Sequence, residues 1–586
     1  MADRAHQDSR MPGPDDAAGG SVPATVGGRA PHSLVRSCAW ALAHALAIVL
    51  AFPPIGLWLL TLVAAAPLAW MALRARSTWR AVWVAFAAQY IAWLWLGRWL
   101  VDVTALGYPV YAANLAAYGA LFVWMLRRAA IHPRFGRLPM TLLVPVLWVA
   151  MECIKGLVIW HGYPWFLAAH PLVEWPLLAQ SADLLGAYFV SFLAVMCSGL
   201  LVDAARRRAG AMSTRAFAVS AVLAAALHLG NAGYGWWRLA QDEPLRDGPR
   251  ILVIQTNLPQ DNKIGWTREA QVRDFGGFIA QTRQAVAEAE ADGPIDLVVW
   301  PETMLPGFGL EPATIETLVG GNYWPASLFS DAIARMREEI GTPMLVGSPV
   351  YLGLRVVDQR YAWDASYNSV YLIQGESPYQ RYDKCVLTPF GETMPYISAW
   401  PWLEQRLLAL GAAGMSFNLD AAAEPTRLDL RWRGGTTAIA TPICFEDTVS
   451  GICRRMAWPD GARRIDLFIN LSNDGWFGAY DGGRQQHAQS ARYRCIENRV
   501  PMIRAANTGL SVLIDSTGKV TGRIGPGRYG QGRVAGHLDA RPRLDSRATL
   551  YGRIGDAWAW LCLLVAAILV ACSYIAVNRN NRTSTA

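Results

Sequence analysis

The chain has 586 residues, of which 53% are hydrophobic, and its mean hydropathy of +0.19 is too high for an ordinary soluble enzyme. This length allows more than one folding unit. The formal net charge is +8. Because cytoplasmic loops of membrane proteins are rich in Lys and Arg, membrane topology explains this charge, which requires neither nucleic acid nor another anionic partner.

The first segment of the chain, residues 1–33, is rich in Gly, Pro, Ala and Asp. It has too few apolar side chains to build a core, so we expect a disordered cytoplasmic tail. A cleavable signal peptide is the alternative. It fits poorly, because the first apolar run starts late and is followed at once by further apolar runs.

Eight apolar segments follow, and most have close to the ~20 residues that a helix needs to cross a bilayer. The seventh is short. We predict a seven-helix transmembrane domain over residues 34–230 and an eighth span over 556–577, followed by a short cytoplasmic tail, 578–586. Many of the 26 tryptophans lie near segment ends, as is typical of interfacial aromatic belts. The approximate cores of the segments are 34–52, 55–73, 79–101, 110–126, 140–159, 184–202, 217–229 and 557–577.

The loops between these segments differ in their content of basic residues. Arginines are concentrated in the second, fourth and sixth loops and after the last segment, so the positive-inside rule predicts that both termini are cytoplasmic. Because seven spans precede the large polar region, that region faces outward. In a bacterium with two membranes it would lie in the periplasm, on a multi-pass protein of the inner membrane. The arginines concerned are Arg74, Arg76, Arg80, Arg127, Arg128, Arg134, Arg137, Arg206, Arg207, Arg208, Arg215, Arg579 and Arg582.

The polar region, residues 245–540, alternates strand-like and helix-like runs. Helices are predicted over 268–291, 326–340 and 485–498. Such alternation predicts a layered α/β domain. The predicted strands are 251–257, 296–300, 344–350, 367–374, 436–443, 467–471, 502–505 and 511–515.

A single cysteine, Cys444, ends one of these strands, and a helix-compatible segment that opens with Glu446 and Asp447 follows it. The free N–H groups and the positive dipole at a helix N-terminus favour a thiolate and an oxyanion. A lone cysteine in an apolar run is more often a buried hydrophobic residue. Two further stretches favour the catalytic interpretation of Cys444.

Acidic and basic side chains follow two other strand-like runs. Glu302 comes directly after a buried-looking strand, and Lys384 follows a hairpin-like segment, with Glu392 eight positions further on. A cysteine is mostly a neutral thiol near pH 7, so a nucleophilic Cys444 needs a base, for which we predict Glu302. We predict that Lys384 and the backbone N–H of Phe445 stabilise the oxyanion. The alternatives are a turn-capping carboxylate for Glu302 and a surface lysine for Lys384.

The order Glu302, Lys384, Cys444 resembles the Glu-Lys-Cys triad of the carbon–nitrogen hydrolase, or nitrilase, superfamily. The segments Asn-Leu-Ser-Asn-Asp-Gly-Trp-Phe-Gly at 470–478 and Arg-Ala-Ala-Asn-Thr-Gly at 504–509 add to the resemblance. With the membrane segments included, the sequence is most similar to the apolipoprotein N-acyltransferases. The resemblance covers nearly the whole chain after residue 34, and it implies a nitrilase-like α-β-β-α sandwich for the polar region.

The same resemblance implies supporting roles for four residues. Glu392 would hold the lysine, Phe445 and Glu446 would act beside the nucleophile, and Asn473 would shape the site or contact the donor lipid. A plain helix-start acid explains Glu446 nearly as well. The chain departs from the family pattern at four positions that leave the triad intact, namely Phe166, Cys385, Thr388 and Phe445.

The reaction that the resemblance implies is the final step of lipoprotein maturation. Cys444 would take an acyl chain from a phospholipid, with phosphatidylethanolamine the implied donor, and hold it as a thioester. The α-amine of the diacylglyceryl-cysteine of an apolipoprotein would then attack the thioester. A thiolate suits this transfer because it attacks and leaves readily. No cofactor is implied, and no metal is predicted because zinc-type Cys/His spacing is absent from the sequence. The sequence leaves open whether Cys453 and Cys495 form a disulfide.

Three aromatic residues are candidates for lipid contact. Trp165 lies between the fifth and sixth spans on the outward side, and Trp476 and Phe477 lie in the polar region. Interfacial anchoring is the alternative for Trp165, and ordinary core packing for the other two. Two segments rich in apolar and aromatic residues, 303–324 and 395–415, are expected to dip into lipid and gate the site.

Two other functions are compatible with parts of this pattern. A membrane-tethered amidase acting on a soluble amide would use the same triad, although eight spans exceed what an anchor requires. A transporter with an outer accessory domain predicts polar residues that face one another within the spans. The spans hold few such residues, with Glu152 and Lys155 near an outward end and Asn114 isolated.

Overall fold

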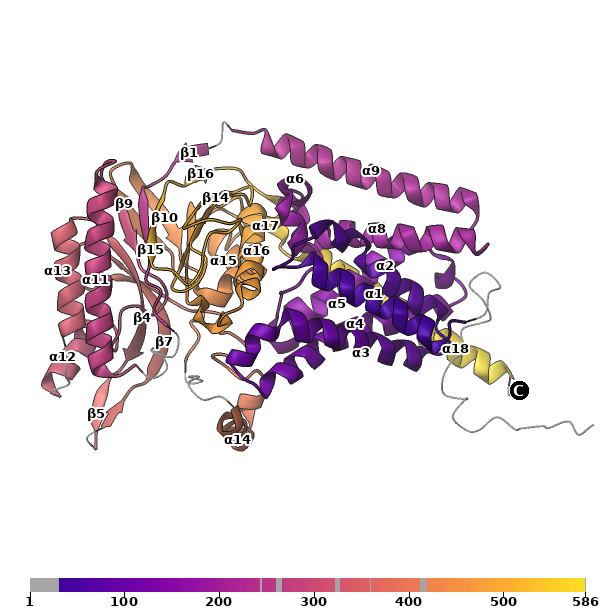
Figure 1. Cartoon of the computed structure of the whole chain (residues 1–586), viewed down its shortest axis with the longest axis horizontal. Coiled ribbons are helices and arrows are strands. Elements are labelled where there is room, and N and C mark those ends of the chain that lie inside the picture. The colour runs from indigo at the N-terminus through magenta and orange to yellow at the C-terminus, as the bar shows by residue number, and fades with distance from the viewer. Residues whose placement is uncertain are drawn as a thin grey trace, which may run out of the picture.

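The computed structural model of the chain describes residues 31–242, 245–259, 266–321, 327–358, 360–411 and 419–584. Most of the predicted tail, 1–33, lies outside these ranges. Figure 1 shows a bundle of helices beside a domain of two sheets, and the C-terminal helix, in yellow, runs back through the bundle.

The helical bundle contains six helices that are long and apolar enough to cross a membrane, counted within the described ranges. They are α1, α4, α5 with its extension to His161, α8, α9 and the first part of α18. Three helices predicted to start on the cytoplasmic side, α1, α3 and α9, are capped by the serine side chains of Ser33, Ser77 and Ser213. The bounds are α1 (Leu34–Ala51), α2 (Thr61–Arg74), α3 (Thr78–Leu96), α4 (Gly107–Ile131), α5 (Met140–Cys153), α8 (Ala187–Arg208), α9 (Thr214–Leu239) and α18 (Ala557–Ser584).

Two of the eight predicted spans are not among these six helices. The segment predicted at 55–73 forms a shorter apolar helix, Trp58–Arg74, of 17 residues at most. Helix α3 has 19 residues, which include Arg80 and Gln89, and it is not one of the six.

The seventh span is longer than the prediction of 217–229, because α9 has 26 residues. Polar side chains interrupt its apolar run, and the sequence pattern therefore ends early. In the structure these side chains are bonded within the bundle. His228 contacts the Cys197 thiol at 3.2 Å, and Asn231 donates to the carbonyl of Leu178 at 3.0 Å.

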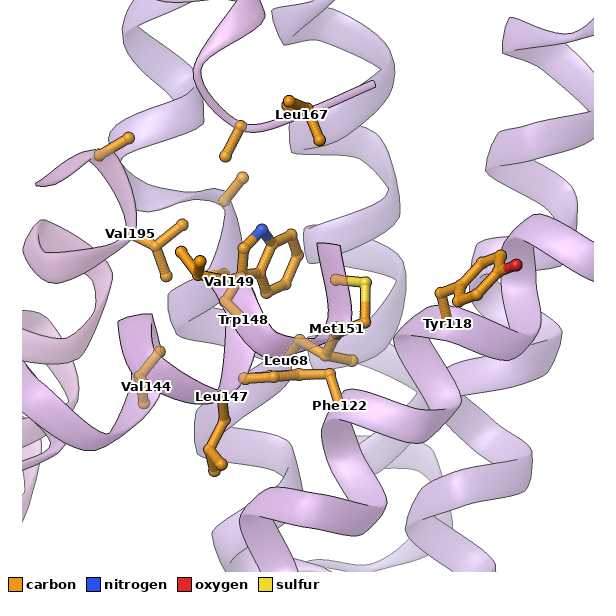
Figure 2. Close-up of a cluster of buried hydrophobic side chains, with 14 of the residues drawn as sticks. Leu68, Tyr118, Phe122, Val144, Leu147, Trp148, Val149, Met151, Leu167 and Val195 are labelled. Carbon is orange, nitrogen blue, oxygen red and sulfur yellow. The ribbon is translucent and has the colours of Figure 1, made fainter. Parts of the chain in front are cut away.

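The core of the bundle is built around Trp148 of α5. Its ring packs edge-on against Phe122 of α4, with the ring centroids 5.1 Å apart, and Leu68 and Leu147 lie beside it (Figure 2). Figure 2 also shows the indole nitrogen directed towards the end of the bundle that carries Leu167.

Two six-stranded sheets pack face to face in the other half of the molecule, in the orders β15-β2-β3-β4-β7-β8 and β14-β13-β12-β11-β10-β9. Alternate residues of β2 face opposite sides, as strand geometry requires. Ile251 and Val253 lie in the core between the sheets, whereas Leu252 and Ile254 lie in the core beneath α11 and α13. Helices α15 and α16 pack on the other sheet, so the layers follow the α-β-β-α order that the resemblance implies (Figure 1). The bounds are β2 (Ile251–Gln255), β3 (Leu297–Val299), β4 (Met344–Leu352), β7 (Ala365–Ile373), β8 (Gln380–Asp383), β9 (Leu428–Trp432), β10 (Gly435–Ala440), β11 (Leu467–Ser472), β12 (Met502–Ala506), β13 (Val512–Ile514), β14 (Val520–Arg523), β15 (Gly536–Ala540), α11 (Arg268–Glu290), α13 (Leu328–Ile340), α15 (Ser450–Ala457) and α16 (Asp481–Asn498).

Helix α16 lies between the second sheet and the bundle, and nearly all of its side chains are buried. Two arginines in and directly after it pair with acidic residues of the bundle half. Arg492 bonds Glu174 at 3.0 Å, and Arg499, directly after the helix, bonds Asp183 at 2.7 Å. Breaking a buried pair costs about 3–5 kcal/mol. These contacts therefore hold the sheet domain in a fixed position on the bundle.

Candidate active site

Cys444 lies where the chain leaves the second sheet. Strand β10 ends at Ala440, and Ile443 still forms a parallel bridge with Leu471 of β11. The φ angle of Cys444 is +50°, in the left-handed region that residues other than glycine rarely adopt. Such a conformation costs about 1–3 kcal/mol and persists only where the surrounding structure imposes it.

The helix that the sequence predicts from Glu446 begins later, at Ser450 of α15. Residues Cys444–Thr448 form a 3₁₀ turn instead, and the Glu446 carboxylate folds back to accept the N–H of Ile443 at 2.8 Å. Glu446 is therefore an acid in the first turn of a short helix, as the simpler sequence interpretation expects, although this helix is 3₁₀ and not α. A turn of five residues has only a small dipole, so it can stabilise an oxyanion through its N–H groups rather than through a macrodipole.

The Glu446 carboxylate ties this turn to the segment that carries the predicted lysine. It accepts the N–H groups of Cys385 and Val386, both at 2.8 Å, and the hydroxyl of Tyr382. Glu446 is fully buried, and burial raises its pKa, although Lys384 and the bonded donors act in the opposite direction. One carboxylate thus fixes the two segments relative to each other.

Lys384 directly follows β8, and its ammonium is buried. Nζ donates to Glu392 at 2.6 Å, and Glu392 also accepts the N–H of Thr388 at 2.8 Å. Burial alone would lower the pKa of Lys384, but Glu392, followed by Cys444 and Glu302, outweighs burial and raises the pKa. Lys384 is therefore a cation at neutral pH, and the surface-lysine alternative is wrong.

Glu302 follows β3 and is buried. Its Oε1 accepts from the amide of Asn368 and its Oε2 from the backbone N–H of Asn473, both at 2.7 Å. The backbone of Asn473 therefore contacts Glu302, whereas sequence reasoning missed Asn368, whose amide also bonds Glu392 at 3.4 Å. Burial, and then the charge of Glu302, raise the pKa of Cys444 well above its usual value. The resting cysteine is therefore a thiol that needs a base.

An aromatic cluster lies at the boundary between the bundle and the sheet domain. The ring of Phe445 is nearly parallel to that of Tyr163 at 6.2 Å, and Tyr163 stacks on Trp165 at 5.8 Å. Trp165 in turn contacts Phe477 at 6.0 Å. Trp165 is only 4% exposed, so the interfacial-anchor alternative does not describe it. Trp476, beside Phe477, is half-buried.

A second group of charged residues lies behind the cysteine turn, and sequence reasoning missed it because its members come from four separate segments. His487 of α16 bonds Asp447 at 2.7 Å and lies 3.2 Å from Asp474. Arg504 of β12 bonds Asp447 at 2.9 Å and Asn470 at 3.3 Å, and the Asn470 amide donates to the carbonyl of the cysteine. Burial and Arg504 lower the pKa of His487, but the two carboxylates outweigh them and raise it to about 9.

No group of three or more His, Cys, Asp or Glu side chains in the described ranges is arranged to hold a metal ion. All nine cysteines lie within those ranges and are free thiols. Cys453 and Cys495 are both buried and unpaired, so the disulfide that the sequence leaves open is not formed.

Both halves of the chain match family models. Residues 44–200 match the apolipoprotein N-acyltransferase N-terminal domain, and residues 258–532 match the carbon–nitrogen hydrolase model. Together with the layered fold, these matches define the class of protein, a carbon–nitrogen hydrolase domain joined to a helical membrane domain. Among solved structures, an amidase from Nesterenkonia sp. is 16% identical, with 53% of this chain and 94% of that chain covered and a TM-score of 0.31.

Two relatives that match across both halves of the chain are both named apolipoprotein N-acyltransferase. The apolipoprotein N-acyltransferase of Geobacter metallireducens is 29% identical over 483 residues, which are 81% of each chain. The apolipoprotein N-acyltransferase of Sinorhizobium fredii is 30% identical over 486 residues, with 81% of this chain and 80% of the relative covered. The chain belongs to the apolipoprotein N-acyltransferase family.

The cluster around His487 predicts a stability that depends on pH. Because folding raises the pKa of His487 from 6.5 to about 9, its stabilising contribution is complete below pH 6.5 and is lost as the pH rises through 9. We expect the thermal unfolding midpoint of the wild type to fall over this range, and that of His487→Gln to fall less. Differential scanning fluorimetry in detergent at pH 6, 7.5 and 9.5 measures the difference. An equal fall for both proteins would contradict the assignment of His487 as a buried cation.

Proposed function

We propose that this chain N-acylates the α-amine of the S-diacylglyceryl-cysteine of apolipoproteins, with a phospholipid as acyl donor and a thioester on Cys444 as intermediate. The names of its relatives support the acceptor and the acyl transfer. The observation that carries the mechanism is the grouping of the partly exposed Cys444 with the buried Glu302 and Lys384. A thiol with a raised pKa, a carboxylate and a fixed ammonium are the groups that acyl transfer through a cysteine requires.

In the first half-reaction Glu302 takes the proton from Sγ of Cys444 as the sulfur attacks the ester carbonyl of the phospholipid. The Lys384 ammonium and the N–H of Phe445 stabilise the oxyanion that forms. The bond between the carbonyl carbon and the glycerol oxygen then breaks. This oxygen takes the proton from Glu302, and a lysophospholipid leaves the acyl group on the sulfur.

In the second half-reaction the α-amine of the diacylated acceptor attacks the thioester carbonyl. Glu302 takes a proton from the amine, the C–S bond breaks, and the thiolate of Cys444 recovers the proton. Water must be kept from the thioester, because it would otherwise be hydrolysed. The aromatic cluster of Phe445, Tyr163, Trp165 and Phe477 supports this requirement, since it covers the cysteine turn with apolar surface.

Four residues around the triad have supporting roles in this scheme. Glu392 holds the Lys384 ammonium, Asn473 orients Glu302, Glu446 joins the cysteine and lysine segments, and Phe445 supplies an oxyanion donor. Trp165, Trp476 and Phe477 are the proposed acyl-chain contacts, and phosphatidylethanolamine is the proposed donor.

The proposed topology has eight spans, namely the six long apolar helices together with Trp58–Arg74 and α3. The arginine-rich loops support cytoplasmic termini and a catalytic domain that faces the periplasm from the inner membrane. The domains are then a cytoplasmic tail (1–33), a transmembrane domain (34–230), the catalytic domain (245–540) and the last span (556–577). A site on the outward side would reach both lipid substrates in the outer leaflet.

Substitution of Cys444 tests the thioester. After incubation with phosphatidylethanolamine, intact-mass spectrometry should show one added acyl chain on the wild type, removed by hydroxylamine and by a diacylated lipopeptide. Cys444→Ala should show none, whereas the neighbouring Cys385→Ala should react like the wild type. Glu302→Gln should slow acylation about 10²-fold or more, because a positioned base contributes that much. Turnover of a small soluble amide without any acyl adduct would refute the proposal in favour of a tethered amidase.

Reporter fusions test the topology. A fluorescent protein that matures only in the cytoplasm should be bright when fused after residue 586, and alkaline phosphatase should be inactive there. Alkaline phosphatase fused after residue 247, at the start of the catalytic domain, should be active. The opposite pattern would mean that the positive-inside assignment is reversed.

A further inference from the structure

Two oppositely charged side chains lie inside the helical bundle, away from the triad. Glu152 of α5 is 1% exposed, and Lys155, in the next turn, is 4% exposed. Burial of an isolated charge costs several kcal/mol per ion. The bonds that these two side chains make must offset this cost, and the partners in those bonds therefore indicate which part of the protein the two charges stabilise.

Both side chains bond the backbone of one loop, residues 160–168, which we name the Trp165 loop. Lys155 Nζ donates to the carbonyls of Trp165 at 2.7 Å and Phe166 at 3.1 Å. Glu152 Oε1 accepts the N–H of Ala168 at 2.7 Å. The Lys155 carbonyl also accepts the N–H of Tyr163 at 2.9 Å, so both ends of the loop are held from the bundle.

The chain is distorted where this loop begins. Residues Ile154–Val158 form a wide π-helical turn, a feature often found at functional sites. Beyond it, Trp160, His161 and Phe166 have φ angles of 58°, 62° and 56° in the left-handed region. Each such residue costs about 1–3 kcal/mol and needs surrounding contacts to keep it in place. The bonds from Lys155 and Glu152 are contacts of this kind.

The Trp165 loop carries two rings of the aromatic cluster, Tyr163 and Trp165. Tyr163 lies against Phe445, the residue after the nucleophile, and Trp165 lies against Phe477 and at 5.6 Å from the ring of His487. A shift of the loop backbone would move both rings relative to the cysteine turn.

We propose that Glu152 and Lys155 are positioning residues for acyl transfer, which hold the Trp165 loop so that Tyr163 and Trp165 form the wall of the acyl site. This inference rests on the proposed function, because the proposed function identifies the acyl chain that the wall would contact. It assigns these two charges to the geometry of the site rather than to transport.

The test separates donor recognition from the chemistry of the cysteine. In Lys155→Met both backbone carbonyls lose a charged donor, and we expect kcat/KM for phosphatidylethanolamine to fall about tenfold or more, mainly through KM. The rate of Cys444 alkylation by iodoacetamide should stay within about twofold of the wild type. Lys155→Arg should restore most of kcat/KM, since a guanidinium can donate to the same carbonyls.

Asp203→Asn is the matched control. Asp203 is equally buried in the bundle and bonds Arg206, three positions on, and Thr141, but it does not contact the Trp165 loop in any bond of the described residues. Its kcat/KM per folded molecule should equal that of the wild type. Equal losses in Asp203→Asn and Lys155→Met, or no loss in Lys155→Met, would overturn the inference.

A replacement variant and the wild-type acylation assay cover the remaining outcomes. If Lys155→Met does not yield folded protein, Glu152→Leu replaces it, because leucine has no oxygen to accept the Ala168 N–H and so removes the bond that holds the loop at that position. A raised KM then supports the inference, and an unchanged KM overturns it. A wild type that never accepts an acyl chain refutes the proposed function, whereas a normal wild type with an unaffected loop variant refutes only the positioning role.

Discussion

Buried charges must be paired, and this constraint joins the two halves of the protein. Helix α16 carries its charged residues into the space between the second sheet and the helical bundle, where water cannot solvate them. Arg492 and Arg499 pair with Glu174 and Asp183 on the bundle side, and loss of either carboxylate would leave a guanidinium buried without its charge partner. The sheet domain is therefore held in a fixed position on the helical bundle. On the other face of the same helix, His487 reaches the cluster behind the nucleophile.

Within the catalytic half, polar contacts between strand ends bring the site together. Glu446 joins the cysteine turn to the lysine segment, and Asn368 bonds both Glu302 and Glu392. These side chains do not have to react with a substrate to matter. They fix the positions of the thiol, the carboxylate and the ammonium. They also hold Cys444 in a left-handed backbone conformation that a cysteine rarely adopts without such contacts. Positioning of this kind can contribute as much to acyl transfer as the charges themselves.

The sequence predicted the features that depend on local pattern. Alternating runs indicated the layered α/β domain, and the order of Glu302, Lys384 and Cys444 indicated the superfamily, a resemblance that the family comparisons confirm. The catalytic roles of the triad stay predictions, although the structure brings the three residues together. The sequence indicated Glu446 as an acid at a helix start but not its bonds to the N–H groups of Cys385 and Val386, because these lie about 60 positions away in the chain. The bonding partners of Lys155 could not be predicted from the sequence for another reason. They are backbone carbonyls, which every residue has and which therefore leave no pattern in the sequence.

In the proposed reaction a single cysteine carries the acyl chain beneath an aromatic wall built from both halves of the protein. The most direct measurement is a cryo-electron microscopy map of the wild type after reaction with phosphatidylethanolamine and without acceptor. The account predicts continuous density from Sγ of Cys444 along the rings of Tyr163, Trp165 and Phe477, with Lys384 beside the thioester oxygen. Density for the acyl chain on another residue, or along a path that avoids these rings, would contradict it.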